Sequence, residues 1–286
     1  MAMHIVVCMK QVPDSAQIRV HPVTNTIMRH GVPTIINPYD LFALEEAMRL
    51  RDRVGGEVTV VTMGPPMAAD SLRKAMTFGV DRAVLLTDRS FAGSDTLATS
   101  YALAGVLKKI GQEWGEPPIV FTGKQTIDGD TAQVGPGIAK RLGLNQLTYV
   151  SRIVDLDEAN ATITVERRAE GGVQLLSTRM PALITMLEGT NEIRRGSLDD
   201  ALRAARAEVV VWNAADAGIE DLTKCGLRGS PTIVKKVFAP TARSEKAHQV
   251  PTIGLSKEEL AISVMSEIFK RQPAVEADLR RFSGEF

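Results

Sequence analysis

The residues best suited to holding a ligand lie in a glycine-rich loop, GKQTIDGDTAQVGPG, at residues 123–137. Gly123 and Gly129 let the backbone approach a ligand closely, and Asp130 and Thr131 are N-cap candidates for a following helix. Phosphate binds at such helix starts because their N–H groups are free. The loop therefore predicts a phosphate or pyrophosphate cradle. From the spacing alone, a capped helix start without a ligand is an equally good interpretation.

A second polar cluster lies in GSDTLATSYALAG, at residues 93–105. Asp95 is a candidate helix cap, and Thr96, Thr99 and Ser100 place hydroxyls near the start of the same helix, where they suit phosphate or ribose oxygens. Hydroxyls in a first helical turn usually satisfy backbone groups, so the residues alone favour that simpler role.

Other chemistries find little support in the sequence. The four histidines are scattered, and Cys8 and Cys225 match no metal-ligand or disulfide spacing. Neither GxGxxG nor GxxxxGK[ST] occurs, so the two common phosphate-binding fingerprints are absent. Lys and Arg total 34, equal to Asp and Glu, which argues against nucleic acid as a partner. We expect no catalytic side chain and no metal.

The elements that position these loops alternate between strands and helices. Apolar, β-branched runs predict buried strands at 4–12, 57–63, 82–87, 117–123 and 181–187. Helical spacing is found at 38–54, 66–78, 96–110 and 131–142. This alternation predicts an α/β fold with a doubly wound, mostly parallel sheet, in which ligands bind at the carboxyl ends of the strands.

The remaining segments depart from this rhythm. Residues 17–29 predict a hairpin, and 146–179 an antiparallel extension of the sheet. We expect a nucleotide-binding α/β domain at 1–212 and an extended arm with short helices at 213–286, since 213–251 is rich in turn residues. No stretch approaches the ~20 apolar residues that span a bilayer, so a soluble, cytoplasmic protein is expected.

Several blocks occur in an order that resembles the β subunit of electron-transfer flavoproteins: VVCMKQVPD, NPYDLFALEEAMRL, VTMGPP, TFGVDRA, GKQTIDGDTAQVGPGIAKRLG, ERRAEGGVQLL and MPALITMLEGTNEIR. The match runs in register to about residue 212. It implies an adenine nucleotide alpha-hydrolase-like domain with a small antiparallel extension, and a C-terminal arm that packs on the α subunit.

The housekeeping branch of that family holds AMP. The blocks GSDTLATSYALA and DTAQVGP, and GLRGSPTIVKKVFAP in the arm, are instead similar to the electron-bifurcating, FixA-type branch, in which FAD replaces AMP. The resemblance implies the following cofactor contacts: Cys8, Asn37, Pro38, Tyr39, Asp40, Met63, Gly64, Asp95, Thr96, Thr99, Ser100, Gly123, Lys124, Gln125, Asp128, Gly129, Asp130, Thr131, Gln133 and Val134.

The same resemblance implies electron transfer. NADH would deliver a hydride to the FAD, and the two electrons would leave singly, one to ferredoxin or flavodoxin and one through the FAD of a FixB-type α subunit to a membrane-associated quinone reductase. Residues 187–206 match a partner-recognition segment with Leu198 as anchor beside Arg194 and Arg195. Without the resemblance, Leu198 is an ordinary helix-start residue.

Two alternatives remain open. One is a housekeeping β subunit with structural AMP, and the other is an adenine-nucleotide-binding regulatory module of similar fold, which would leave the recognition segment and the arm without a role.

Overall fold

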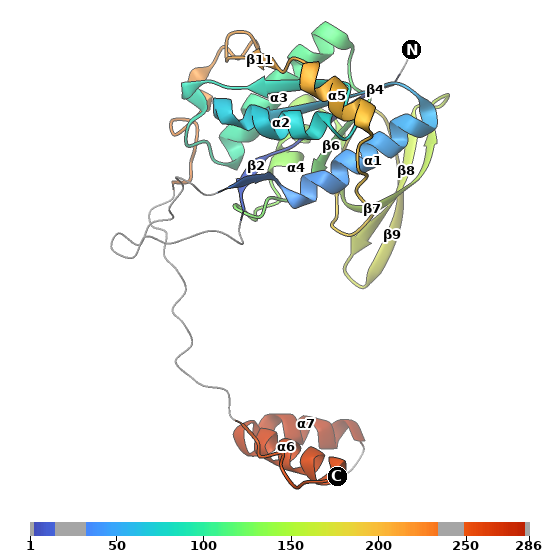
Figure 1. Ribbon diagram of the computed structural model, residues 1–286, viewed down its shortest axis with the longest axis vertical. Coiled ribbons are helices and arrows are strands. Elements are labelled where there is room, and N and C mark those ends of the chain that lie inside the picture. The colour runs from blue at the N-terminus through green and yellow to red at the C-terminus, as the bar shows by residue number, and fades with distance from the viewer. Residues whose placement is uncertain (1–2, 15–32, 234–248, 284–286) are drawn as a thin grey trace. The chain divides into compact units, whose positions relative to one another are not determined.

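The computed structural model describes residues 3–14, 33–233 and 249–283. Their main feature is a nine-stranded sheet in the order β11-β5-β4-β1-β6-β10-β7-β8-β9 (Figure 1). The strands are β1 His4–Cys8, β4 Glu57–Met63, β5 Arg82–Leu86, β6 Ile119–Gly123, β7 Asn145–Asp157, β8 Thr162–Ala169, β9 Gly172–Arg179, β10 Ala182–Met186 and β11 Val210–Trp212.

The sheet is parallel from β11 to β7, and β8 and β9 add an antiparallel end. The chain moves outward from β1 through β4 to β5, then returns to place β6 on the other side of β1. This reversal is a topological switch point, where open α/β sheets bind ligands. Both the doubly wound fold and the antiparallel extension predicted from the sequence are confirmed.

Helices cover both faces of the sheet. They are α1 Pro38–Val54, α2 Ala69–Met76, α3 Thr96–Trp114, α4 Val134–Leu142 and α5 Leu198–Arg206, with short 3-10 turns η2 Pro66–Ala68, η3 Arg89–Phe91 and η4 Leu222–Lys224. One core joins α1 and α2 to the sheet face carrying Ile5 and Val7, and the other joins α3 and α4 to the face carrying Val6 and Cys8. Strand β1 is buried on both faces for this reason.

The first strand is shorter than the sequence predicts. A strand over 4–12 was expected, but β1 ends at Cys8 because the Lys10 N–H donates to Asp40 Oδ2 at 2.7 Å rather than to the sheet. The following residues pair as β2 Gln11–Pro13 with β3 Thr34–Ile36 in a separate two-stranded sheet. The hairpin predicted at 17–29 lies outside the described residues.

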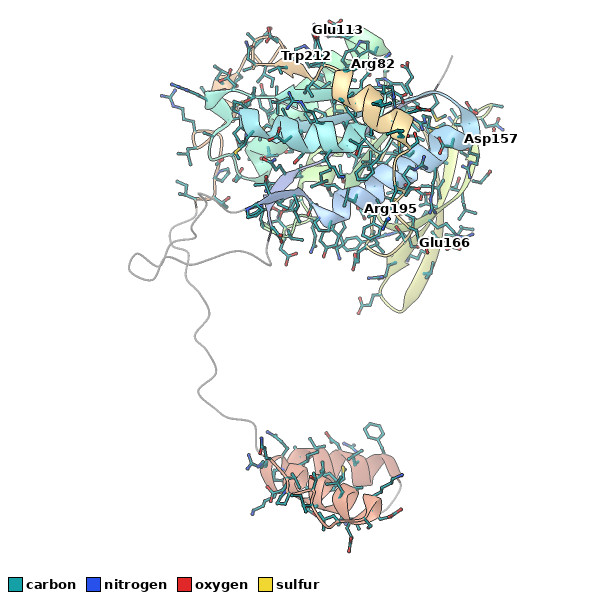
Figure 2. All side chains as sticks on the ribbon, in the orientation of Figure 1. Arg82, Glu113, Asp157, Glu166, Arg195 and Trp212 are labelled. Carbon is teal, nitrogen blue, oxygen red and sulfur yellow. The ribbon has the colours of Figure 1, made fainter. Side chains whose placement is uncertain are left out.

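The edge strand β11 is fixed by aromatic stacking. Trp212 stacks on Trp114 of α3 with ring centroids 5.5 Å apart. Arg82 lies over the Trp114 ring and Lys109 over the Trp212 ring. Arg82 and Trp212 are labelled in Figure 2. Such pairs contribute about 0.5–1.5 kcal/mol beyond their burial. A three-residue edge strand is thereby held to the helix layer.

The chain forms two compact units, and the predicted domain division at residue 212 stays a prediction. A first unit spans Met1–Phe238 and a second Ala239–Phe286. Ala214, Ala217, Ile219 and Cys225 are buried in the α3 core, so the start of the predicted arm packs on the α/β domain. The second unit contains α6 Lys257–Arg271 and α7 Pro273–Ser283, which contact each other and bury no α6 residue.

Candidate functional site

The candidate site lies at the carboxyl ends of β1 and β6, beside the start of α1. Asp40 on α1 is buried there and accepts backbone hydrogen bonds from Lys10 N at 2.7 Å and Gly123 N at 3.1 Å. Burial raises the pKa of the Asp40 carboxyl to about 7, against these hydrogen bonds and the Lys10 charge, which lower it. Asp40 therefore joins the two strand ends that border the switch point.

Asn37 fixes the loop that follows β6. It occupies the N-cap position of α1 but makes no cap hydrogen bond. Its side chain is fully buried and instead donates to Gln125 O at 2.8 Å and accepts from Ile127 N at 3.2 Å. A residue that the sequence suggests as a helix start thus shapes the glycine-rich loop.

Gly123 is needed for the close approach of α1 to β6. A Cβ at this position would lie 2.5 Å from Asp40 Oδ1 and 2.6 Å from the Tyr39 carbonyl carbon. Lys124 Nζ lies 5.0 Å from the centroid of the Tyr39 ring, and Lys10 Nζ contacts Asp128 at 2.8 Å. The structure therefore brings the predicted residues of the α1 start and the β6 loop together.

The loop before α4 corrects one prediction. Thr131 was expected as an N-cap with the helix starting there, but α4 begins at Val134. Asp130 and Ala132 have φ of 56° and 55°, in the left-handed region that ends helical continuity. Gln133 then returns to the right-handed region. Alternation between left-handed and right-handed residues is typical of nests, in which successive backbone N–H groups face one anion.

The start of α4 is left open. Gln133 makes no side-chain cap, and the N–H groups of Val134 and Gly135 have no acceptor among the described residues. Gly129 and Thr131 are exposed beside it. Inside the same turn, Gly135 approaches Thr122 of β6 so closely that a Cβ would lie 2.9 Å from its hydroxyl. This helix start can meet an anion.

The start of α3 is, in contrast, already satisfied. Asp95 Oδ1 accepts from Leu97 N at 2.9 Å and Ala98 N at 3.0 Å, which confirms the predicted cap. Ser100 is buried, donates to Leu97 O and accepts from Arg141. Roles of Asp95, Thr99 and Ser100 as cofactor contacts stay predictions.

One hydrogen bond links the two helix starts. Thr96 Oγ1 donates to Gln133 Oε1 at 2.9 Å. Gly137 of α4 also lies against Ser100 of α3, where a Cβ would be 2.8 Å from the Ser100 Oγ. The polar clusters singled out in the two loops are therefore neighbours in the fold.

The ends of β1 and β4 supply apolar surroundings. Cys8 is buried, and burial, followed by the nearby Asp40 charge, raises the pKa of its thiol to about 12. A neutral thiol of this kind is a poor nucleophile. Met63 packs partly buried against the same core as Cys8, and Gly64 N donates to Leu86 O. The described residues hold no cluster of three His, Cys, Asp or Glu that suits a metal ion.

The predicted recognition segment is anchored to α1 and α2. Arg194 contacts Glu45 at 2.9 Å and Asp52 at 2.7 Å, both on α1. Gly196 presses on α2, where a Cβ would lie 1.6 Å from Thr77 O. An open groove of about 580 Å³ lies between this segment and α1.

Side chains beyond these anchors point outward. Leu198, the first residue of α5, is 75% exposed. Arg195, labelled in Figure 2, is exposed. It has no ion pair among the described residues. Ser197 caps α5 through a capping box with Asp200. Sequence reasoning missed Glu45 as an anchor, although its pairing with Arg49 one turn later was a visible signal.

None of the helices within the described residues combines the length and apolar character needed to cross a bilayer.

Comparison with known proteins extends over most of the chain. A family model described as an electron transfer flavoprotein domain matches residues 24–217. The chain is 74% identical over 277 residues to Protein FixA of Azorhizobium caulinodans, which covers 97% of this chain and 98% of that protein. It is 63% identical over 279 residues to Protein FixA of Azotobacter vinelandii, with 98% and 99% covered. Electron transfer flavoprotein subunit beta of Clostridium acetobutylicum is 45% identical over 267 residues, with 93% and 98% covered.

Proposed function

Because the chain belongs to the electron transfer flavoprotein family, we propose that it is the β subunit of a heterodimeric, electron-bifurcating flavoprotein and holds FAD in the crevice outside the carboxyl ends of β1 and β6. The family predicted from the sequence blocks is confirmed, and electron transfer is its shared activity. Subunits of this kind pair with an α subunit, and we propose a FixB-type partner.

The open start of α4 carries this proposal. Its free N–H groups, the left-handed residues before it and the close approach allowed by Gly123 form an anion cradle at the switch point. A dinucleotide pyrophosphate fits this chemistry, since the cradle offers backbone donors and no carboxylate caps the helix.

Neighbouring groups are placed to orient the rest of the cofactor. Asn37 and Asp40 hold the loops on either side of the cradle, and Lys10 adds a positive charge at the rim. When bound, FAD would accept a hydride from NADH and release the two electrons one at a time. In this proposal the chain contributes position and electrostatics, because the cofactor itself carries the electrons.

The acceptors belong to the same proposal. We propose ferredoxin or flavodoxin for one electron, and for the other a membrane-associated quinone reductase reached through the α-subunit FAD. The outward-facing Leu198 and Arg195 on an anchored backbone support docking of a redox protein at this segment. A rigid apolar anchor flanked by charge is typical of such interfaces.

Cofactor content of the purified heterodimer tests the proposal. We expect two flavins per heterodimer and bleaching of the flavin absorbance by NADH. One flavin with AMP and no bleaching would instead establish the housekeeping alternative, and ATP without flavin would establish the regulatory one.

A variant pair localises the cradle. Thr131→Glu places a carboxylate beside the proposed pyrophosphate and is expected to weaken nucleotide retention by about 1–3 kcal/mol. Thr131→Gln has the same shape without the charge and serves as the control. Equal retention in both variants and the wild type would show that the phosphates bind elsewhere.

A further inference from the structure

The start of the predicted arm is hydrogen-bonded to the α3 start. Thr232 N and Oγ1 both donate to Asp95 Oδ2, at 3.1 and 2.8 Å. The buried Ser230 hydroxyl accepts from Asp95 N at 2.8 Å and donates to Gly226 O at 2.6 Å. Asp95 is therefore shared: one carboxylate oxygen caps α3 and the other holds residues that lie far along the chain.

The segment 226–232 is shaped for this contact. Gly226 has φ of +57°, and a Cβ there would lie 2.3 Å from Ser90 O. Its N–H donates to Ser94 Oγ at 3.0 Å. At Gly229 a Cβ would lie 2.1 Å from the Lys224 carbonyl. Close backbone approaches of this kind indicate that segment 226–232 packs tightly in one position.

The contacts continue into the crevice. Asp95 caps the turn that carries Thr96, and Thr96 donates to Gln133 at the open start of α4. Loss of the Ser230 and Thr232 contacts frees Asp95 to move, which loosens the α3 cap and the Thr96–Gln133 hydrogen bond. Linked contacts of this kind couple two sites when both favour one arrangement, and the coupling is reciprocal.

We propose that segment 226–232 positions the nucleotide crevice through Asp95, so that seating of this segment and nucleotide retention strengthen each other. The identity of the ligand in this proposal rests on the proposed function. The hydrogen bonds that join segment 226–232 to Asp95 do not depend on it. Asp95, Ser230 and Thr232 act as positioning residues here, because they hold the helix start that faces the cradle.

The test uses the full-length heterodimer in three variants. Ser230→Ala removes the acceptor of Asp95 N, and Thr232→Val removes one donor to its carboxylate. Thr223→Val is the matched control, since the Thr223 hydroxyl donates to Asp221 in the same stretch and not to α3. The readouts are the dissociation constant of FAD at the crevice and amide hydrogen exchange at Leu97 and Ala98.

We expect the dissociation constant to rise about tenfold in Ser230→Ala and about threefold in Thr232→Val, the range of one hydrogen bond lost. Amide exchange at Leu97 and Ala98 should be faster in both variants. The Thr223→Val variant should behave as the wild type, and so should Thr232→Ser, because serine keeps the hydroxyl that donates to Asp95. In the wild type, FAD should slow exchange at Gly226 and Thr232, which a merely structural contact would not predict.

The outcomes separate the two proposals. A wild-type crevice that holds AMP in place of FAD overturns the bifurcating assignment alone, and the same comparison is then made with AMP. A crevice that binds neither overturns both. Wild-type binding together with unchanged affinity and exchange in Ser230→Ala and Thr232→Val overturns the coupling alone.

Discussion

Helix α1 carries two buried carboxylates in opposite surroundings, Asp40 in its first turn and Glu45 near its middle. Asp40, at the crevice, accepts hydrogen bonds from the backbone of Lys10 and Gly123, and its burial raises its pKa to about 7. Glu45, beneath the recognition segment, is also buried, which raises its pKa, but hydrogen bonds from Arg194 and Arg49 outweigh this and leave it below the ordinary value.

The difference indicates what each part of the helix is suited to bind. A carboxyl that is readily neutral gives little repulsion to a phosphate nearby and still accepts hydrogen bonds. A charged carboxylate held by arginines instead fixes a backbone on which Leu198 and Arg195 remain free for a protein partner. We interpret α1 as one rigid element that serves a small anionic ligand at its first turn and anchors the recognition segment from its middle onward.

The largest effect is expected from disrupting the packing of the recognition segment against the end of α2. Gly196→Ala places a methyl group 1.6 Å from Thr77 O, so the segment must leave α2. We expect the free energy of unfolding to fall by about 3 kcal/mol, with electron transfer to the partner reduced and nucleotide retention kept. Urea unfolding and flavin content measure the two.

Two variants sharpen that result. Leu198→Ala keeps the backbone and removes the exposed side chain, so it should reduce partner electron transfer with a change in stability of less than about 0.5 kcal/mol. Gly189→Ala lies in the same segment at φ +69° with no atom within 4 Å, and should add only modest strain. Loss of nucleotide in Gly196→Ala would mean that the crevice and the recognition segment are not independent.

A smaller effect is expected from breaking the ion pairs that Glu45 makes with Arg194 and Arg49. Glu45→Gln leaves Arg194 and Arg49 without their shared buried carboxylate, and we expect a loss of about 2 kcal/mol at pH 7. Because the folded pKa of Glu45 lies below its ordinary value of 4.5, the stabilisation that its ion pairs give is present above pH 4.5 and is lost as pH falls through the folded pKa. When the free energy of unfolding is measured as a function of pH, the Glu45→Gln variant should not show this loss of stability at acidic pH.

Arg195→Gln provides the comparison for Glu45→Gln. The Arg195 side chain is exposed and has no ion pair among the described residues, so stability should stay within about 0.5 kcal/mol of the wild type. A similar loss in both variants would show that the buried pair contributes no more to stability than an unpaired, exposed charge on the segment.

Local signals in the sequence were enough for most of the fold. Pro38 and Gly55 bound α1 as predicted, and β-branched runs located β1, β4 and β6, because buried parallel strands need continuous apolar residues. Turn residues between 146 and 179 likewise revealed the antiparallel strands.

Contacts distant in sequence decided the rest. The N–H of Lys10 leaves β1 for Asp40, and Ala132 adopts a positive φ that its type does not suggest. Glu45 meets Arg194, and Asp95 meets Thr232, across more than a hundred residues. No local pattern announces such pairs, so the site was predicted as separate loops and its connections were not.

Among the variants that change a buried contact, the smallest effect on stability is expected in the first turn of α1, in Asp40→Asn. Asn has one acceptor oxygen, so one of the two N–H groups of Lys10 and Gly123 loses its partner, which costs about 1 kcal/mol. The variant also removes a titration. In the wild type the unfolded carboxyl ionises near 3.8 and the folded one near 7, so stability falls as pH rises between these values.

The difference between wild type and Asp40→Asn should therefore be largest near pH 4 and shrink toward pH 8, the reverse of Glu45→Gln. Asp128→Asn, which removes the exposed partner of Lys10, should leave the wild-type slope in place. Parallel profiles for Asp40→Asn and the wild type would mean that the carboxyl is already ionised well below pH 7. Both buried carboxylates of α1 would then carry fixed negative charge, and an anionic ligand at the crevice would need the Lys10 ammonium to balance it.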